Sequence, residues 1–262
     1  MFDNSQKLNK TEKGRNFVLG FTLLELMVTI SIAIIVTAIS FANLPNYSSK
    51  LSLELLAQDI AVSIRQAQVY GTSIYGSPSD EGYRVFQAYG VHFPAISDSS
   101  PGQYKYALFA DLLGLIPGDV SGRLRNNFEY DGTNNGPNFT TCGTPTGNNE
   151  CLEKFYVTGL REEISGFCLN YFPPDADPST FDTFEKRWGN CLNGAVENSP
   201  RLKTLDIVFN RPDLAANFFG VDFNGDTHKN TGSNIGIIIN SPKIDYKRAI
   251  VVWANGQISI DK

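Results

Sequence analysis

The most pronounced pattern in the sequence is a long apolar segment near its N-terminus. From Phe21 to Ser49 only one side chain, Glu25, carries a charge, and the apolar run from Phe21 to Leu44 is 24 residues long. At about 1.5 Å per residue a helix of this length reaches roughly 36 Å, whereas the hydrocarbon layer of a membrane is about 30 Å thick. Residues 21–45 are therefore predicted to form a membrane-spanning helix.

Beyond Pro45, where a helix can kink or end, the apolar positions become periodic. They recur at spacings of three and four residues and so share one face of a helix: Leu53, Leu56, Ile60, Ile64 and Ala67. Gly71 and the cluster Gly76-Ser77-Pro78 are helix-ending signals. Residues 46–72 are thus predicted to be an amphipathic helix whose apolar stripe packs under a globular head, with a partner-binding stripe as the alternative.

From residue 73 onward the pattern changes to short aliphatic and aromatic runs bounded by Gly, Pro, Asn or Asp, which is typical of strands. The predicted strands are Tyr83–Phe93, Gln103–Phe109, Phe155–Val157, Ile164–Leu169, Thr204–Phe209, Ile235–Ile239, Arg248–Trp253 and Gln257–Ile260. Asn255-Gly256 predicts a two-residue type I′ hairpin at the end of the chain. The polar stretches 126–150 and 171–194 are expected to be long loops. The expected fold class is α+β: a long N-terminal helix followed by a β-rich, sandwich-like head at 73–262.

Composition changes this picture mainly through charge. The 262 residues carry a formal net charge of −5, yet residues 1–20 have a net charge of +2, which leaves −7 for the remainder. Since Lys and Arg next to a membrane span stay on the cytoplasmic side, the basic arm is expected inside and the acidic head outside. The apolar run exceeds the roughly 7–15 residues of a secretory signal peptide, which favours an anchor over a cleaved signal.

An anchor by itself does not explain Glu25. An ionisable side chain inside an apolar span costs about 2.5–3.5 kcal/mol on insertion scales, so such a residue is by default a functional candidate. A carboxylate at this position is expected to have a cationic partner.

The stretch Gly20-Phe21-Thr22-Leu23-Leu24-Glu25-Leu26-Met27-Val28 resembles the processing site of type IV prepilins and type II secretion pseudopilins. The resemblance implies that prepilin peptidase, a membrane aspartyl protease, removes the leader 1–20 by cutting between Gly20 and Phe21. It also implies N-methylation of Phe21 and a precursor that crosses the inner membrane once, with its head outside the cytoplasm. The expected partners are an inner-membrane assembly platform and other pilins or pseudopilins in a helical filament at the cell surface.

This resemblance supplies a partner for Glu25. Cleavage creates a positive amine at Phe21, and in a filament the Glu25 carboxylate can face the amine of a neighbouring subunit. Each charge is costly in lipid by itself, and pairing removes much of that cost only when the subunits are in register. Glu25 is therefore expected to select correct assembly.

Two departures and a second resemblance suggest a minor rather than a major subunit. Major pilins commonly carry a Gly and a Pro inside the apolar run, where this chain has Ile34 and Ala42. Segments 205–212 and 249–258 resemble head strands of minor pseudopilins of the H type. The expected function is that of a structural minor pilin or pseudopilin, in either a type IV pilus or a type II secretion filament.

All four cysteines lie in the part expected outside the cytoplasm, which favours two disulfides. Of three connectivities, the simplest joins Cys142 to Cys151 and Cys168 to Cys191. A zinc site is the rival interpretation, but no two of these cysteines are separated by just two residues.

The spacing of Asp222, Asn224 and Asp226 suggests oxygen ligands for calcium, although the Gly at the sixth position and the distant Glu of an EF-hand loop are missing. The alternative is a tight turn at Asn224-Gly225 with solvated carboxylates. No other cofactor is expected.

Two other classes of function are alternatives to a filament subunit. A membrane-anchored enzyme is not expected, because the sequence lacks Gly-x-Ser-x-Gly, His-Glu-x-x-His and phosphate-loop motifs, and His92 and His228 are far apart. A DNA-binding minor pilin of the competence type is the alternative. Its candidate patch comprises Arg201, Lys203, Lys243, Lys247, Arg248 and Lys262. The acidic balance of the remainder argues against nucleic-acid binding.

Overall fold

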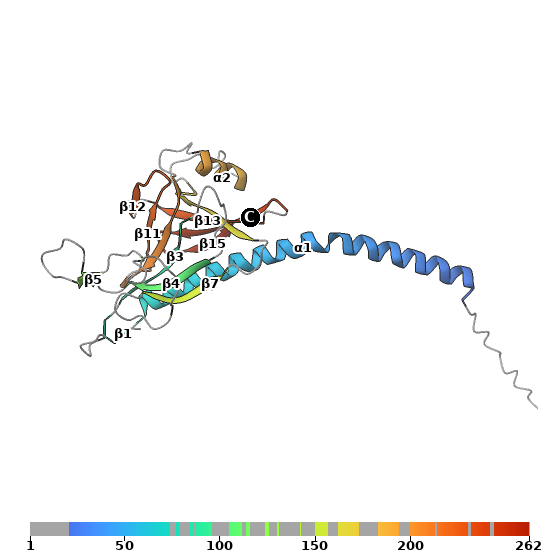
Figure 1. Cartoon of the computed structure of the whole chain (residues 1–262), viewed down its shortest axis with the longest axis horizontal. Coiled ribbons are helices and arrows are strands. Elements are labelled where there is room, and N and C mark those ends of the chain that lie inside the picture. Colours follow the sequence, from blue (N-terminus) through green and yellow to red (C-terminus); the bar gives the residue numbers. More distant parts are fainter. Residues whose placement is uncertain are drawn as a thin grey trace, which may run out of the picture. The chain divides into compact units, whose positions relative to one another are not determined.

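The computed structural model describes residues 21–73, 77–78, 84–85, 87–95, 105–111, 114–115, 124–125, 130, 142, 150–156, 162–172, 183–193, 200–212, 214–229, 232–241 and 244–261. The chain divides into two compact units, residues 1–45 and residues 46–262. In the second unit the strands gather around the C-terminal part of the first helix (Figure 1).

Helix α1 (Leu23–Thr72) is 50 residues long and supplies both predicted helical segments. It continues through Pro45. Of the two possibilities at this proline, a kink or an end of the helix, the end is wrong. The helix ends at Thr72, next to the predicted glycine signal. A Cβ at Gly71 would lie 2.3 Å from the carbonyl oxygen of Phe209, so only glycine allows this close approach to the head.

A six-stranded sheet forms one layer of the head, in the order β12-β11-β10-β3-β4-β7. Its strands are β3 (Ala88–Phe93), β4 (Lys105–Asp111), β7 (Cys151–Tyr156), β10 (Leu205–Phe209), β11 (Ala216–Val221) and β12 (Thr227–Lys229). Neighbouring strands pair antiparallel throughout this sheet.

A five-stranded antiparallel sheet, in the order β15-β14-β13-β8-β9, forms the second layer. Its strands are β8 (Glu163–Leu169), β9 (Arg201–Leu202), β13 (Asn234–Ser241), β14 (Tyr246–Trp253) and β15 (Ile258–Asp261). Two short pairs complete the described strands: β1 (Ser77–Pro78) with β2 (Arg84–Val85), and β5 (Gly114–Leu115) with β6 (Leu124–Arg125).

The main core lies between α1 and the inner faces of both large sheets. The predicted helical stripe is confirmed, since Leu53, Leu56, Ile60, Ile64 and Ala67 are all buried in this core. The two sheets meet there as well: the ring centroids of Phe93 on β3 and Phe167 on β8 are 5.4 Å apart. The expected class, a long apolar helix followed by antiparallel sheets with two disulfides, is confirmed.

One segment expected to be a loop is helical. Within 171–194, helix α2 (Phe184–Asn193) begins after Thr183, whose Oγ1 accepts a hydrogen bond from the backbone N–H of Lys186 at 3.4 Å. Phe184, Trp188 and Cys191 are buried against the outer face of the five-stranded sheet. Their spacing of four and three residues is the helical signal, which the surrounding Pro, Asp and Gly residues obscured.

Several strand predictions need correction. The predicted run Tyr83–Phe93 contains two strands, β2 and β3. Phe155 and Tyr156 are the end of β7, and Val157 lies outside the described residues. Sequence inspection missed β11, although its residues include a buried phenylalanine pair. The final β14–β15 hairpin is confirmed, but its turn is not type I′: of Asn255 and Gly256 only Gly256 has positive φ, at 82°. The backbone N–H of Gly256 bonds to the carbonyl of Trp253 at 2.8 Å, which gives a longer loop with glycine in the left-handed position.

Candidate assembly site and the contacts of the head

The candidate assembly residues lie at the start of α1. Phe21 is 77% exposed and precedes the helix, whereas Glu25 is exposed in its first turn. The Oγ1 atom of Thr22 accepts a hydrogen bond from the backbone N–H of Glu25 at 3.2 Å, so Thr22 caps the helix. Gly20, the predicted cleavage residue, lies outside the described residues. The described geometry therefore places the Glu25 carboxylate about one helical turn from Phe21.

The spacing Thr22-x-x-Glu25 is itself a helix-start signal that the sequence interpretation missed. In a capping box, a Ser or Thr at the helix start and a Glu three residues later bond reciprocally to each other's backbone N–H groups. The structure contains the bond that Thr22 accepts. A carboxylate in the first turn also interacts favourably with the helix dipole. Glu25 is thus suited to starting the helix as well as to pairing with an amine.

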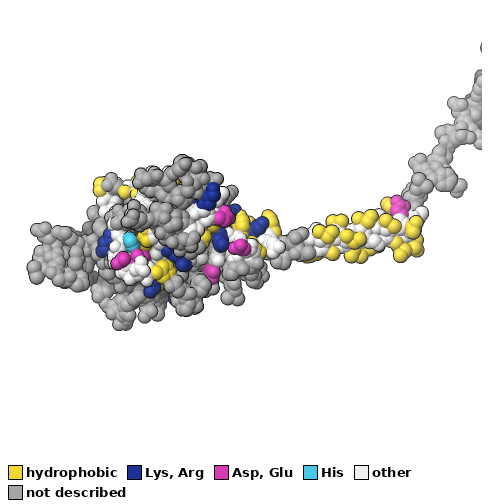
Figure 2. Space-filling view, turned by 90° about the horizontal axis from the view of Figure 1, so that it is seen from above, with side chains coloured by type: hydrophobic (Ala, Val, Ile, Leu, Met, Phe, Trp, Pro, Cys, Tyr) yellow, Lys and Arg dark blue, Asp and Glu magenta, His cyan; other side chains and the backbone are white. Residues whose placement is uncertain are grey.

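The first part of α1 presents apolar side chains to its surroundings (Figure 2). Large apolar residues between Phe21 and Leu44 are between 50% and 77% exposed. Its hydroxyl groups bond to carbonyls one turn back: Thr29 to Leu26, Ser31 to Met27, Thr37 to Ala33 and Ser40 to Val36. Because lipid offers no hydrogen bonds, such internal pairing makes these hydroxyls tolerable in a membrane. Among the described residues, α1 is the one helix long and apolar enough to span a membrane.

The second part of α1 is attached to the head by polar contacts as well as by its apolar stripe. Glu54 Oε1 accepts hydrogen bonds from Arg248 Nε at 2.8 Å and Nη2 at 2.6 Å. Further along, the hydroxyls of Ser63 and Tyr106 lie 3.2 Å apart. Burial raises the pKa of Tyr106 to about 12, and the bond to Ser63 opposes this shift only in part. None of these long-range contacts has a local sequence signal.

At the end of α1, Gln68 Nε2 donates to the carbonyl oxygens of Leu214 at 3.2 Å and Gly256 at 3.1 Å. Gln68 is 3% exposed. The helix end is therefore bound to the final hairpin. A Cβ on Gly256 would lie 2.1 Å from the Leu214 carbonyl, which is a second reason for glycine at this turn.

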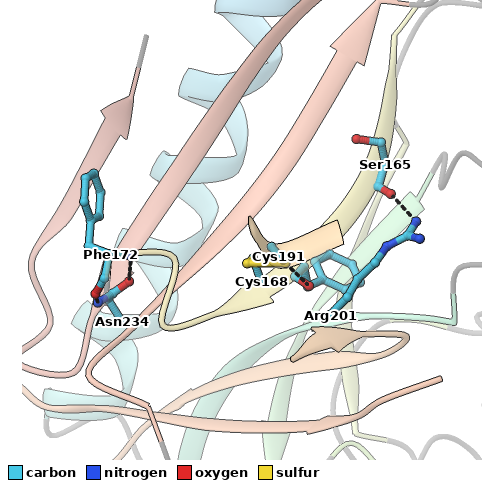
Figure 3. The surroundings of a disulfide bond; sticks show 7 residues. Ser165, Cys168, Phe172, Cys191, Arg201 and Asn234 are labelled. Carbon is cyan, nitrogen blue, oxygen red and sulfur yellow. Dashed lines mark hydrogen bonds between the residues drawn. A yellow bond between two sulfur atoms is a disulfide. The ribbon is translucent and has the colours of Figure 1, made fainter. Parts of the chain in front are cut away.

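Both disulfides join cysteines that neighbour each other along the chain. Cys142 is bonded to Cys151 at the start of β7, and Cys168 on β8 is bonded to Cys191 on α2. The second bridge holds α2 on the outer face of the five-stranded sheet (Figure 3). Beside it, Arg201 Nη2 donates to the carbonyl of Ser165 at 3.2 Å, while Asn234 bonds both backbone polar groups of Phe172. A Cβ on Gly166 would lie 2.5 Å from the Trp188 ring.

The calcium candidates form a tight turn. Asp222 Oδ1 accepts hydrogen bonds from the backbone N–H groups of Asn224 at 2.8 Å and Asp226 at 2.9 Å, and its Oδ2 lies 3.1 Å from His228 Nε2. Burial opposes ionisation, but these hydrogen bonds outweigh it and lower the pKa of Asp222. Both carboxylate oxygens of Asp222 have nitrogen partners, which favours the tight-turn interpretation, while calcium binding by Asp222, Asn224 and Asp226 stays a prediction.

His92 lies inside the head. Its Nδ1 is 2.5 Å from Asp206 Oδ1, across the β3–β10 pairing, and its ring lies 4.5 Å from the ring of Tyr130. Burial raises the pKa of Tyr130 to about 12, with Glu150 and Asp206 adding to the shift. His228, by contrast, is partly exposed on the short edge strand β12. The two histidines therefore belong to separate places in the six-stranded sheet.

Both arginines of the candidate DNA-binding patch make contacts within the head. Arg248 is 9% exposed and bound to Glu54, while the Arg201 guanidinium lies 4.8 Å from the Phe223 ring. Lys247 pairs with Asp245 at 3.2 Å. Lys243 and Lys262 lie outside the described residues. Lys203 is exposed, so the described members of this patch offer a phosphate backbone Lys203 and the paired Lys247 as accessible cations.

Comparison with known proteins assigns the N-terminal segment. Residues 15–41 match the family model for the prokaryotic N-terminal methylation motif. No curated protein and no solved structure matches the chain. The chain thus carries a prepilin-type N-methylation motif on a long apolar helix and is similar, over this segment, to type IV pilins and pseudopilins. This motif implies processing by prepilin peptidase and pilin-type assembly.

Proposed function

We propose that this chain is a minor pilin or pseudopilin that joins an extracytoplasmic helical filament through its N-terminal helix. The observation that carries the proposal is Glu25, an exposed carboxylate in the first turn of an apolar helix, inside the methylation motif. In this proposal residues 1–20 are the leader and residues 21–45 span the inner membrane. Residues 46–72 are the second part of the helix and pack against the head at 73–262.

Assembly follows from the cost of isolated charges in lipid. A neighbour that arrives in register brings its methylated Phe21 amine to Glu25, so two charges that are each costly alone become a pair. A neighbour out of register leaves both charges unpaired. The pair thus selects the register, while the surrounding apolar surface of α1 supplies the non-specific attraction.

We expect a structural role for the head. Pilin-like proteins are generally structural, and the N-terminal segment carries the methylation motif. The head would then supply the surface that distinguishes this subunit from others in the filament. Pilus and secretion filament remain equal candidates for its site of action.

The test is mass spectrometry of the mature protein from cells with active prepilin peptidase. We expect a chain that begins at N-methylated Phe21. Gly20→Val should leave the leader attached because the bulkier residue hinders access of the protease to the backbone, whereas the matched change Gly14→Val in the leader should be processed normally. A mature chain that begins before Phe21 would contradict the proposal.

A further inference from the structure

The outer face of the second part of α1 carries a stripe of apolar side chains that the head leaves exposed. Leu51, Leu55, Val62 and Val69 are between 49% and 65% exposed. Their spacings of four, seven and seven residues place them along one line of the helix. This outer stripe lies opposite the buried one, since Val62 follows the buried Ile60 by two residues, which is about 200° around a helix. The helix therefore has two apolar faces, and packing against the head explains only one of them.

The outer stripe follows the repeat of a coiled coil, in which the contact positions alternate at spacings of three and four residues. The repeat runs through six positions, all of them exposed: Leu51, Leu55, Gln58, Val62, Arg65 and Val69. Lipid is a poor occupant of this line, because the charge of Arg65 is costly in an apolar medium. A second helix fits it, because side chains of that helix can insert between those of the repeat.

Arg65 gives the outer stripe its specific chemistry. Its Nη1 atom donates a hydrogen bond to Oε1 of Gln68, and Gln68 is itself held by the carbonyl oxygens of Leu214 and Gly256. Among the described residues no carboxylate is paired with Arg65. A guanidinium that is oriented by an amide and flanked by Val62 and Val69 is suited to a carboxylate that a partner brings, because a charged pair bonds more strongly than a neutral one.

A second copy of this chain at the same height does not suit the outer stripe. Subunits that are anchored in one membrane by their N-terminal helices run parallel, and in a parallel pair in register each contact position faces itself. Arg65 would then face the Arg65 of the copy. Glu54 and Asp59, which flank the stripe on opposite sides five residues apart, would also approach each other across the pair. Both contacts bring like charges together, which favours a different partner.

We propose that the outer stripe packs against the helix of a different filament subunit, whose apolar line carries a carboxylate opposite Arg65. This inference rests on the proposed function, because it requires parallel helices anchored in one membrane. Glu25 lies inside the methylation motif, so every neighbour with the same motif offers it the same amine and the Glu25 pair does not tell neighbours apart. A partner without an acid opposite Arg65 leaves that cation unpaired, so Arg65 selects which subunit becomes the neighbour.

The test is photo-crosslinking of the full chain in cells, with p-benzoylphenylalanine in place of Val62 and mass spectrometry of the products. We expect a cross-link to the helix of another protein that carries a methylation motif. Arg65→Glu should reduce this product about tenfold or more, because it brings like charges together, whereas Arg65→Lys should keep most of it. A lysine in place of the partner's facing carboxylate should restore the cross-link of Arg65→Glu.

Lys203→Glu is the matched control, since it makes the same change of charge at an exposed position of the head and should leave the cross-link unchanged. Cross-links only to a second copy, to the head of the same chain or to lipid would overturn the proposal, as would a product that Arg65→Glu does not reduce. A chain that begins at Phe21 but gives no cross-link to another subunit overturns this inference alone. A chain that is not processed at Phe21 overturns the proposed function as well.

Discussion

The two parts of α1 share one helical backbone but differ in how their apolar side chains are exposed. Up to Leu44 the large apolar side chains are exposed on every side, and the hydroxyls bond to the helix itself. From residue 46 onward the apolar side chains include one buried stripe, and polar side chains reach other elements of the head. In the first part, an apolar surface all round fits a lipid environment. In the second part, individual contacts with the head determine how the helix packs.

This difference indicates where a single substitution should have a large effect on incorporation or on stability. In the first part the large apolar side chains are exposed, and in the proposed function the Glu25 carboxylate selects the neighbouring subunit. In the second part each buried side chain has a particular neighbour, so its loss leaves a cavity or an unpaired group. Variants in the two parts should therefore fail in different assays: incorporation into filaments for the first, and stability of the head for the second.

The largest effect is expected in the buried stripe. Ile60→Ala should lower the free energy of unfolding of the head by about 2–5 kcal/mol, because it leaves a cavity in the main core. Val62→Ala, two residues away but at a position that is 65% exposed, should change it by less than about 0.5 kcal/mol. Denaturant unfolding followed by near-UV circular dichroism measures both. Equal costs would show that the two faces of the helix are not distinct.

The next effect concerns Glu25. Glu25→Ala should reduce incorporation into filaments by about 70-fold or more, since the Phe21 amine that it leaves unpaired in lipid costs about 2.5–3.5 kcal/mol. Thermal stability of the head should not change. Quantitative immunoblotting of sheared filaments against the membrane fraction measures incorporation.

Thr22→Ala separates helix capping from charge pairing at the same site. It removes the hydroxyl that caps the helix but leaves the carboxylate, and should cost about 1 kcal/mol of helix stability. Incorporation should therefore fall less than for Glu25→Ala. If both variants are incorporated equally poorly, Glu25 acts mainly as a helix-start residue.

A smaller effect is expected at the polar contact between α1 and β14. Glu54→Ala leaves Arg248 buried without its carboxylate and should cost about 1–2 kcal/mol, a value moderated by the 31% exposure of the Glu54 side chain. Breaking the exposed pair of Lys247 and Asp245 should cost about 0–1 kcal/mol. A double-mutant cycle with Arg248→Met gives the coupling energy, and a value near zero would refute the contact.

The smallest effect is a pH dependence at Tyr106. Its pKa is raised from 10.0 to about 12 in the folded chain, so the folded state favours the neutral phenol. This contribution is complete below pH 10 and is lost as the pH rises toward 12, by about 1 kcal/mol at pH 11. Tyr106→Phe should show a correspondingly shallower decline between pH 10 and 12. An unchanged slope would mean that Tyr106 is accessible to solvent.

Features with a local or periodic signal were predictable from the sequence. The apolar run, the helical stripe from Leu53 to Ala67 and most long strands were found because burial repeats with the period of the element. Helix α2 was missed because its three buried residues lie among turn-forming residues. The type of the final turn was predicted wrongly because an Asn-Gly pair also suits a longer loop in which only the glycine has positive φ.

The features of the candidate site likewise fall into those that the sequence predicted and those that it did not. By itself the sequence determined the apolar helix, the motif around Glu25 and the adjacent pairs of cysteines, because these depend on composition and short-range order. Only the tertiary structure decided that Glu54 bonds to Arg248 and that the Asp222 carboxylate is hydrogen-bonded within its own turn. Such pairings depend on sheet register and on the close packing of strands distant in sequence, for which no short segment carries a signal.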